Sequence, residues 1–358
     1  MFTLSNNQRK CFGLTPINEQ WEFIEAKPSP YDNFKTYLYL DGNTIVKCIL
    51  SGDEKYSEYE LSEKITPDKK YLLPKTNRGK PVLLSSSSIQ KRTGTGMCLR
   101  YYRDSIDLYN QKTECSYYHN TYENDNINSI TDFSHWIENW CKDTTNDDIE
   151  DIISFSKSSR QHVKFKEGDV FRFKINRRLY GYGRVLLDYD KMRKEKIPFW
   201  DILMCKPVVC SVYHIATERS DLSVNELKAV LSLPSTIIAD NNLYYGEYSI
   251  IGNIPVDTDE DYPIMYGRGI GITEKPAIFY QCGKVFRKIE NGTLLYGGFI
   301  NNGVNFSLNF KLDILKQCIS ENSNDPYWSL YYTHSVNTDL RNPQYKVKLQ
   351  NVKKQFNL

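Results

Sequence analysis

The sequence contains no long hydrophobic run. Its longest apolar stretches, at residues 207–210 and 237–239, are far shorter than the ~18 residues that a membrane-spanning helix needs. The first ten residues, from Met1 to Lys10, also lack the apolar segment of a signal peptide. We therefore expect a soluble, cytoplasmic protein with no membrane partner.

Paired cysteine and histidine motifs are missing as well. The nine Cys include no CxxC pair, and an odd number of Cys without a signal peptide indicates reduced thiols. None of the five His lies in His-Glu-x-x-His or His-x-His spacing. Cys205, Cys210 and His214 come closest to a metal-binding cluster, but buried Cys beside a core His is the better interpretation. We predict no metal site and no cofactor.

An excess of charge of one sign is absent too. The 46 Lys and Arg side chains balance 44 Asp and Glu to a net charge of +2, and the two signs are interleaved. Nucleic-acid-binding proteins usually carry a basic excess or a basic stripe, because phosphate contacts dominate their affinity. We therefore predict no nucleic-acid partner.

Local catalytic motifs are also lacking. The sequence has no Gly-x-Ser-x-Gly elbow of a serine hydrolase and no Gly-x4-Gly-Lys-Ser/Thr phosphate loop. Nucleophilic catalysis by Cys or Ser stays open, because catalytic partners meet in space rather than in sequence. We assign no catalytic residue and favour a protein that is not an enzyme.

The sequence does contain enough apolar material for a sizeable core. It has 358 residues, 40% of them hydrophobic, which indicates two or three domains. Residues 1–120 are typical of a β-rich module, because strand-like runs at 37–40 and 44–50 flank Asp41-Gly42, a hairpin signal. We expect further strands at 71–73, 82–84 and 97–102.

Residues 121–163 form a predicted helical connector between two β-rich modules. Apolar residues at helical spacing predict a helix over 130–140, with Thr131 or Asp132 as its N-cap. A second amphipathic helix is expected over 147–158. After the second module, residues 311–358 are expected to form a helical C-terminal extension.

Residues 164–310 form the second predicted β-rich domain. The pattern predicts a hairpin of strands 170–175 and 180–187, strands at 207–217, 244–250, 277–282 and 294–299, and a short helix over 223–231. Gly181 and Gly183 share one face of their strand, which favours close approach of a ring, a backbone or a partner. We expect an α+β, β-rich fold in which this domain is a small, strongly bent sheet or barrel.

Aromatic and charged side chains in this domain are candidates for binding a protein partner. Interface anchors are commonly Tyr, Trp and Arg, and an acidic loop at 257–261 suits a basic cleft and would speed association. The alternatives are ordinary sheet packing for the tyrosines and a solubilising role for the acidic loop. The candidate residues are Tyr180, Tyr182, Arg184, Tyr244, Tyr245, Asp257, Asp259, Glu260, Asp261 and Tyr262.

Three blocks of this domain resemble a known family. Residues 163–175 (VKFKEGDVFRFKI), 180–186 (YGYGRVL) and 244–256 (YYGEYSIIGNIPV) are similar to the immunity protein 26 family of bacterial polymorphic-toxin systems. The resemblance covers about 164–310. It implies a mostly β domain that binds a cognate toxin, often a nuclease, and blocks it. The family has no agreed catalytic set to carry over.

Two alternative functions stay open beside a toxin-neutralising protein. One is a nucleic-acid-binding or regulatory module, because small bent sheets can stack bases on an aromatic face. The other is a metal-dependent hydrolase of phosphotriesterase type, an activity to which the family's name is sometimes joined. Such a hydrolase normally needs several His or carboxylate ligands.

Overall fold

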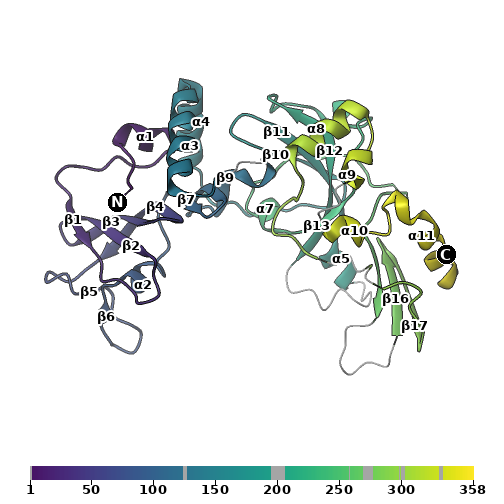
Figure 1. Ribbon diagram of the computed structural model, residues 1–358, viewed down its shortest axis with the longest axis horizontal. Coiled ribbons are helices and arrows are strands. Elements are labelled where there is room, and N and C mark those ends of the chain that lie inside the picture. The colour runs from purple at the N-terminus through teal and green to yellow at the C-terminus, as the bar shows by residue number, and fades with distance from the viewer. Residues whose placement is uncertain are drawn as a thin grey trace. The chain divides into compact units, whose positions relative to one another are not determined.

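Antiparallel strands make up most of the regular structure in both halves of the chain. The computed structural model describes residues 2–123, 127–194, 206–257, 259–268, 277–297, 299, 303–329 and 334–358. The chain divides into two compact units, Met1–Gln161 and His162–Leu358 (Figure 1). Cys205, which with Cys210 and His214 came closest to a metal-binding cluster in the sequence, lies outside the described residues.

A seven-stranded antiparallel sheet forms the centre of the first unit, in the order β1-β2-β3-β4-β7-β8-β9. Its strands are β1 (Glu22–Glu25), β2 (Phe34–Asp41), β3 (Thr44–Gly52), β4 (Lys55–Lys64), β7 (Met97–Tyr102), β8 (Ser105–Asn110) and β9 (Cys115–His119). A separate hairpin consists of β5 (Tyr71–Leu72) and β6 (Val82–Leu83). The helices are α1 (Asn6–Cys11), α2 (Ser86–Ile89), η1 (Asn120–Tyr122), α3 (Ile130–Asp143) and α4 (Asn146–Ser156).

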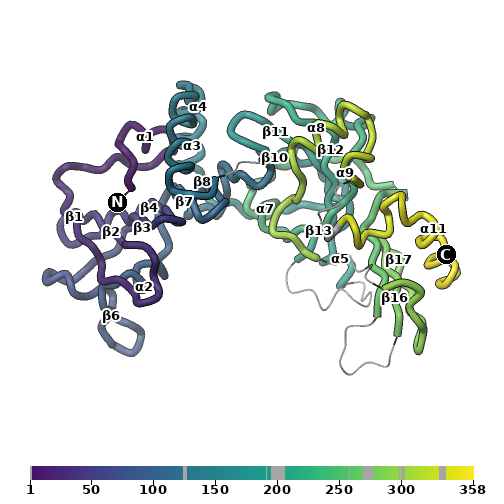
Figure 2. Tube along the Cα trace, in the orientation of Figure 1, coloured from purple at the N-terminus to yellow at the C-terminus, as the bar shows by residue number. Residues whose placement is uncertain are grey.

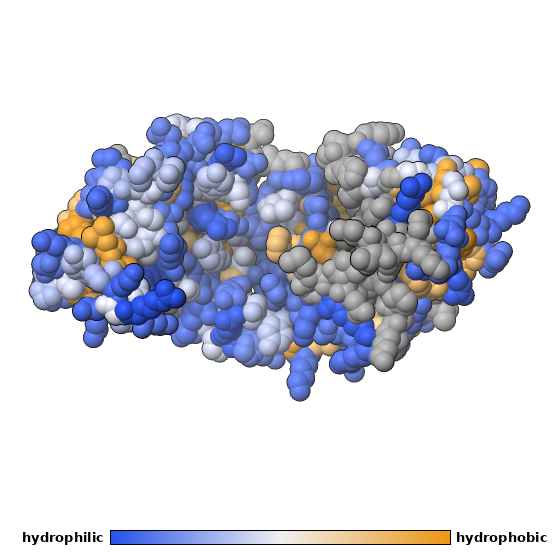
Figure 3. All heavy atoms as spheres, turned by 90° about the horizontal axis from the view of Figure 1, so that it is seen from below, coloured by the Kyte–Doolittle hydropathy of each residue, from blue (hydrophilic) through white to orange (hydrophobic). Residues whose placement is uncertain are grey.

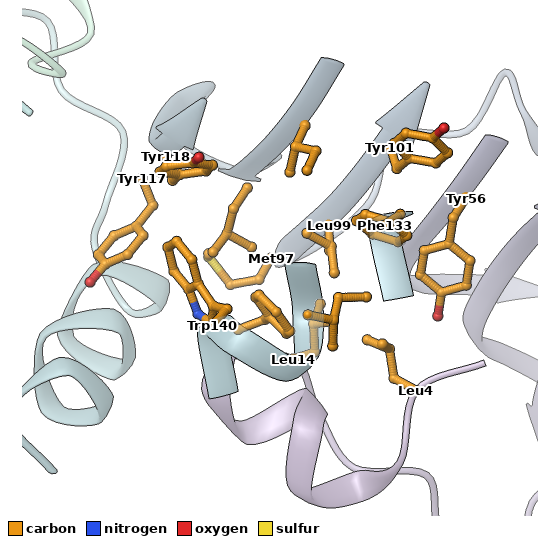
Figure 4. Close-up of a cluster of buried hydrophobic side chains, with 14 of the residues drawn as sticks. Leu4, Leu14, Tyr56, Met97, Leu99, Tyr101, Tyr117, Tyr118, Phe133 and Trp140 are labelled. Carbon is orange, nitrogen blue, oxygen red and sulfur yellow. The ribbon is translucent and has the colours of Figure 1, made fainter. Parts of the chain in front are cut away.

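Both faces of this sheet are buried. Successive side chains of a strand point to opposite faces, and on β4 Tyr56 belongs to one hydrophobic cluster while Tyr59 belongs to another. Helix α3 covers the Tyr56 face, where Phe133 stacks on Tyr101 with ring centroids 4.7 Å apart (Figure 4). Ile152 of α4 is buried in the same cluster. The helices that we expected as a connector are therefore elements of the first unit's core.

The local signals for turns and helix starts were partly correct. The expected hairpin at Asp41-Gly42 joins β2 and β3, and Gly42 has the positive φ of +57° that such a turn favours. The predicted N-cap of α3, Thr131 or Asp132, was wrong. The N-cap is Ser129, whose side chain accepts a hydrogen bond from the backbone N–H of Asp132.

The second unit contains a five-stranded and a three-stranded antiparallel sheet. The larger sheet has the order β13-β12-β11-β10-β14 and the smaller one β15-β16-β17. The strands are β10 (Asp169–Lys174), β11 (Tyr180–Asp188), β12 (Pro207–Thr217), β13 (Thr236–Ala239), β14 (Ser249–Asn253), β15 (Ile264–Arg268), β16 (Ala277–Cys282) and β17 (Val285–Glu290).

The described residues of the second unit form open sheets and no closed barrel, so of the two expected forms, a strongly bent sheet or a barrel, the barrel is not found. Strands β13 and β14 are the two outermost strands of the larger sheet. The segment expected as a strand over 244–250 instead begins in helix α7 (Asn241–Tyr244), and Gly246 then turns the chain with a φ of +79°. Only Ser249–Asn253 remains as strand, and within the described residues it pairs with β10 alone.

Short helices surround these sheets. They are α5 (Tyr189–Lys194), α6 (Val224–Leu227), α7, α8 (Leu312–Glu321), α9 (Asp325–Trp328), α10 (His334–Asn337), η3 (Pro343–Tyr345) and α11 (Lys346–Gln355). Figure 2 shows the C-terminal helix α11, in yellow, beside β16 and β17, and Phe356 packs there against Tyr266 and Tyr280. No helix within the described ranges has the length and apolar character to cross a membrane.

Candidate protein-binding surface

The β10–β11 hairpin is built around two glycines that admit two aromatic rings. Phe173 pairs across the strands with Gly181, and Phe171 pairs with Gly183. A Cβ at Gly181 would lie 2.4 Å from Cζ of Phe173, and one at Gly183 would lie 2.5 Å from Cζ of Phe171. The sequence predicted that a ring, a backbone or a partner approaches these glycines closely. The groups that do so are the rings of Phe171 and Phe173 on the neighbouring strand β10.

The two tyrosines of this hairpin lie in different environments. Tyr182 is fully buried, and its hydroxyl donates to the backbone oxygen of Arg219 at 2.8 Å. Tyr180 is half-buried, with the guanidinium of Arg172 5.3 Å and the ammonium of Lys174 5.7 Å from its ring centre. Tyr182 is thus a packing residue, whereas Tyr180 keeps an accessible surface.

Arg184 and Glu260 are brought together from distant parts of the sequence. They form an ion pair in which the side chains are only 14% and 13% exposed. Glu260 also accepts a hydrogen bond from the backbone N–H of Asp257 at 3.2 Å. Because the pair is largely removed from water, its charges fix the acidic loop on β11 and are less available to a partner.

The rest of the acidic loop has both fixed and exposed charges. Asp261 accepts hydrogen bonds from the backbone N–H of Ser235 at 2.9 Å and from Arg341 at 2.7 Å. Tyr262 is half-buried, and burial together with the charge of Glu260 raises its pKa to about 12. Asp257 and Asp259 are exposed, so they are the loop's outward-facing carboxylates.

A second group of candidate residues gathers beside the start of the unit. The rings of His162 and Tyr244 stack with centroids 4.9 Å apart, and Tyr245 meets Tyr244 edge-on at 5.2 Å. His162 and Tyr244 are exposed, and Tyr245 is half-buried. We call Tyr244, Tyr245 and His162 the aromatic triad. Sequence reasoning missed His162, which lies 82 positions before Tyr244 and carries no local signal of this contact.

The surface visible in Figure 3 is mainly hydrophilic, and its hydrophobic residues gather in small patches. In that view, a partner would therefore meet polar surface with limited apolar contacts. Aromatic side chains with a polar tip are suited to such a surface, because they bury apolar area and still form hydrogen bonds.

His214 on β12 has a structural role. Its Nε2 lies 2.9 Å from Oδ1 of Asn324, and the amide of Asn324 donates to the backbone oxygen of Ser232. Oδ1 is therefore the acceptor and Nε2 carries the proton. Burial lowers the pKa of His214, which keeps the ring neutral. Cys210 and His214 lie on the same strand, but nowhere in the described ranges do three His, Cys, Asp or Glu gather as metal ligands.

The first unit contains a buried charge cluster that sequence reasoning also missed. Glu58 is fully buried and forms ion pairs with Lys47 at 2.8 Å and with Arg9 at 2.7 Å. The hydroxyl of Tyr56 donates to Glu58 at 2.7 Å. Burial alone would raise the pKa of Glu58, but Lys47 and Arg9 outweigh it and the pKa is lowered. The available signal was Lys47 inside the apolar strand 44–50.

Comparison with known proteins assigns part of the second unit. Residues 166–276 match the family model of Immunity protein 26, which covers less than a third of the chain. This segment includes all five strands of the larger sheet of the second unit. No curated protein and no solved structure matches the chain.

Proposed function

From the match of residues 166–276 to Immunity protein 26, we propose that the protein neutralises a cognate toxin of a polymorphic toxin system. It acts by forming a stoichiometric complex with the toxin, without catalysis. The family match is the observation that carries this proposal. The presence of the complete five-stranded sheet within the matched segment supports a binding scaffold there.

The aromatic triad is the proposed anchor of this complex. Tyr244 and His162 are exposed and stacked, so their rings are held in place before a partner arrives. A rigid aromatic group loses little conformational freedom on binding. Tyr180, on β11, is proposed as a further contact, while buried Tyr182 supports the sheet beneath it and Arg184 fixes the acidic loop.

The exposed carboxylates of Asp257 and Asp259 are proposed to attract the toxin. If the toxin is a nuclease, its substrate cleft is basic, and an acidic loop complements it. Arg184 and Arg341 fix Glu260 and Asp261, so the loop presents the other two carboxylates from a defined position. Charges of this kind act mainly on the association rate and on its dependence on salt.

The direct test is co-expression with each gene product encoded beside this one, followed by pull-down and a survival assay. We expect one neighbour to be toxic alone, to form a tight complex with this protein and to be neutralised by it. If no neighbour is toxic and none binds, the proposal loses its support.

The aromatic anchor has its own test in that complex. Tyr244→Ala should weaken toxin binding by roughly 30-fold or more, the range of an interface hot spot of about 2 kcal/mol. Tyr31→Ala is the matched control, because Tyr31 is 95% exposed in the first unit. Equal dissociation constants of the two variants, measured by calorimetry, would remove Tyr244 from the interface without affecting the proposed function.

A further inference from the structure

Three aromatic rings surround the ammonium group of Lys348. The side chain of Lys348, on α11, places Nζ 4.7 Å from the ring centre of Tyr345, 5.1 Å from that of Phe299 and 5.6 Å from that of Tyr296. All three distances lie within the ~6 Å over which a cation is attracted to an aromatic ring.

The rings form walls that stand nearly perpendicular to one another. The planes of Tyr296 and Phe299 meet at 84°, and those of Phe299 and Tyr345 meet at 80°. Neighbouring contacts hold this arrangement, since Phe299 is buried and Asn351 of α11 donates to the hydroxyl of Tyr296 at 2.8 Å. The three rings are therefore held in place around the position of the Lys348 ammonium group.

Lys348 has no carboxylate within ion-pair distance among the described residues. Its half-buried side chain instead places the ammonium near the three rings, whose faces carry the negative part of the ring quadrupole. A structural lysine would commonly pair with Asp or Glu, as Lys47 does with Glu58 in the first unit. A site lined by aromatic rings rather than by a carboxylate favours a cation that loses little hydration energy on binding. Alkylated ammonium ions are such cations, because they are less strongly hydrated than a primary ammonium.

We propose that Tyr296, Phe299 and Tyr345 form an ammonium-binding cage, which takes alkylammonium and quaternary ammonium groups and is closed in the free protein by Lys348. The tether of the lysine to α11 gives it an effective concentration in the millimolar range. A free ligand enters the cage only if its concentration and affinity are high enough to displace the lysine ammonium. Removal of the Lys348 ammonium opens the site. This inference is independent of toxin binding.

The opened cage is tested with tetramethylammonium chloride as the probe. Lys348→Ala should lower the thermal midpoint by about 2–4 °C, because the cation–π contacts of α11 are lost. Tetramethylammonium should then restore part of this loss, relative to sodium chloride at the same ionic strength, and should stabilise the wild type less. Adding Tyr296→Ala to Lys348→Ala should remove the effect of the probe.

Lys346→Ala is the matched control, because Lys346 is an exposed lysine on the same helix. It should change neither the midpoint nor the response to the probe. Lys348→Met retains the apolar stem and separates the loss of charge from the loss of packing. If tetramethylammonium and sodium chloride act identically on both Lys348 variants, the proposed site does not exist.

A measurement on the unaltered chain covers the case in which neither variant folds. Protons close to the face of an aromatic ring resonate upfield of their usual position. In lysine-labelled wild-type protein, the Hε signals of one lysine should be shifted upfield, and Lys348→Arg should remove that signal. If all lysine Hε signals coincide, Lys348 does not occupy a cage in solution.

Discussion

Gly183 has no room around it for a side chain. A Cβ at this position would lie 2.6 Å from the backbone oxygen of Ser211 as well as 2.5 Å from the ring of Phe171. A ring can turn, but the oxygen belongs to strand β12 and cannot move without disturbing its pairing with β11. The position therefore tolerates no side chain at the present spacing of the strands.

Gly183→Ala should destabilise the second unit by about 1–3 kcal/mol, the usual effect of overpacking a well-packed core. Chemical denaturation followed by circular dichroism measures this loss. Gly303→Ala provides the control, because a Cβ there meets no atom within 4 Å. A Gly183→Ala protein as stable as the control would mean that the two strands separate easily.

Glu58 compensates two buried cations at once, so its loss leaves both without their partner. Glu58→Gln should lower the free energy of unfolding by about 3–5 kcal/mol, the effect of breaking a buried ion pair. Glu54→Gln should change it by less than about 1 kcal/mol, because the Glu54–Arg103 pair is exposed. Urea denaturation of the two variants checks the contrast.

The same carboxylate also gives the stability of the first unit a defined dependence on pH. The pKa of Glu58 in the folded protein is lowered from its ordinary value of 4.5. Its contribution is therefore complete above pH 4.5 and is lost as the pH falls through the lower, folded pKa. We expect the acid limb of the stability curve to be flatter in Glu58→Gln, and an unchanged limb would contradict the assignment.

At the scale of elements, the start of α3 depends on one side chain. Ser129 Oγ accepts from the N–H of Asp132 at 3.1 Å and donates to its carboxylate at 2.8 Å. Ser129→Ala should therefore destabilise the first unit by about 1 kcal/mol. Thr131→Ala, within the first turn of the helix, should be nearly neutral. Thermal melting of both variants shows whether Ser129 or Thr131 caps the helix.

Elements with strong local signals were predictable from the sequence. The strand 207–217 coincides with β12, and the hairpin 170–175 and 180–187 matches β10 and β11 closely. The structure of the segment 244–250 was not predictable from the sequence. Its alternating apolar residues suit a strand, but they also suit the end of a short helix followed by a turn at Gly246. There the local pattern is compatible with two structures, and tertiary packing selects between them.

The contacts of the candidate site depend on pairings that no local pattern contains. Glu260 was recognised as part of an acidic loop, but its partner Arg184 lies 76 positions earlier in the sequence. Tyr182 was a candidate contact because tyrosine suits both interfaces and sheet cores, and it is buried because it packs with Val170, Tyr213 and Leu227. Residue types were thus predictable, whereas exposure was not.

At the scale of the whole molecule, each unit contains its own hydrophobic clusters. Clusters around Tyr56 and around Leu38 lie in the first unit, and clusters around Val209, Ile278 and Val170 lie in the second. In the second unit, residues beyond the family match contact the matched segment: Asn305 forms an isolated bridge with Ile238, and Asn324 donates a hydrogen bond to Ser232 at 2.9 Å. The matched segment alone therefore lacks part of its packing.

We predict that a fragment of residues 162–358 folds and still binds the toxin partner, whereas residues 162–276 do not fold stably. Circular dichroism and thermal melting of the two fragments test folding, and pull-down tests binding. A folded 162–358 fragment that fails to bind would place an essential contact in the first unit.

The indole N–H of Trp140 donates to the backbone oxygen of Cys11, a contact that spans 129 positions of sequence. Ribosomes add roughly 5–20 residues per second, so Cys11 is synthesised about 6–26 s before Trp140. During that time the apolar side chains next to α1, such as Phe12, have no helix α3 to pack against. Until α3 has been made, the nascent segment around α1 therefore exposes part of the first unit's core, which favours binding to a chaperone.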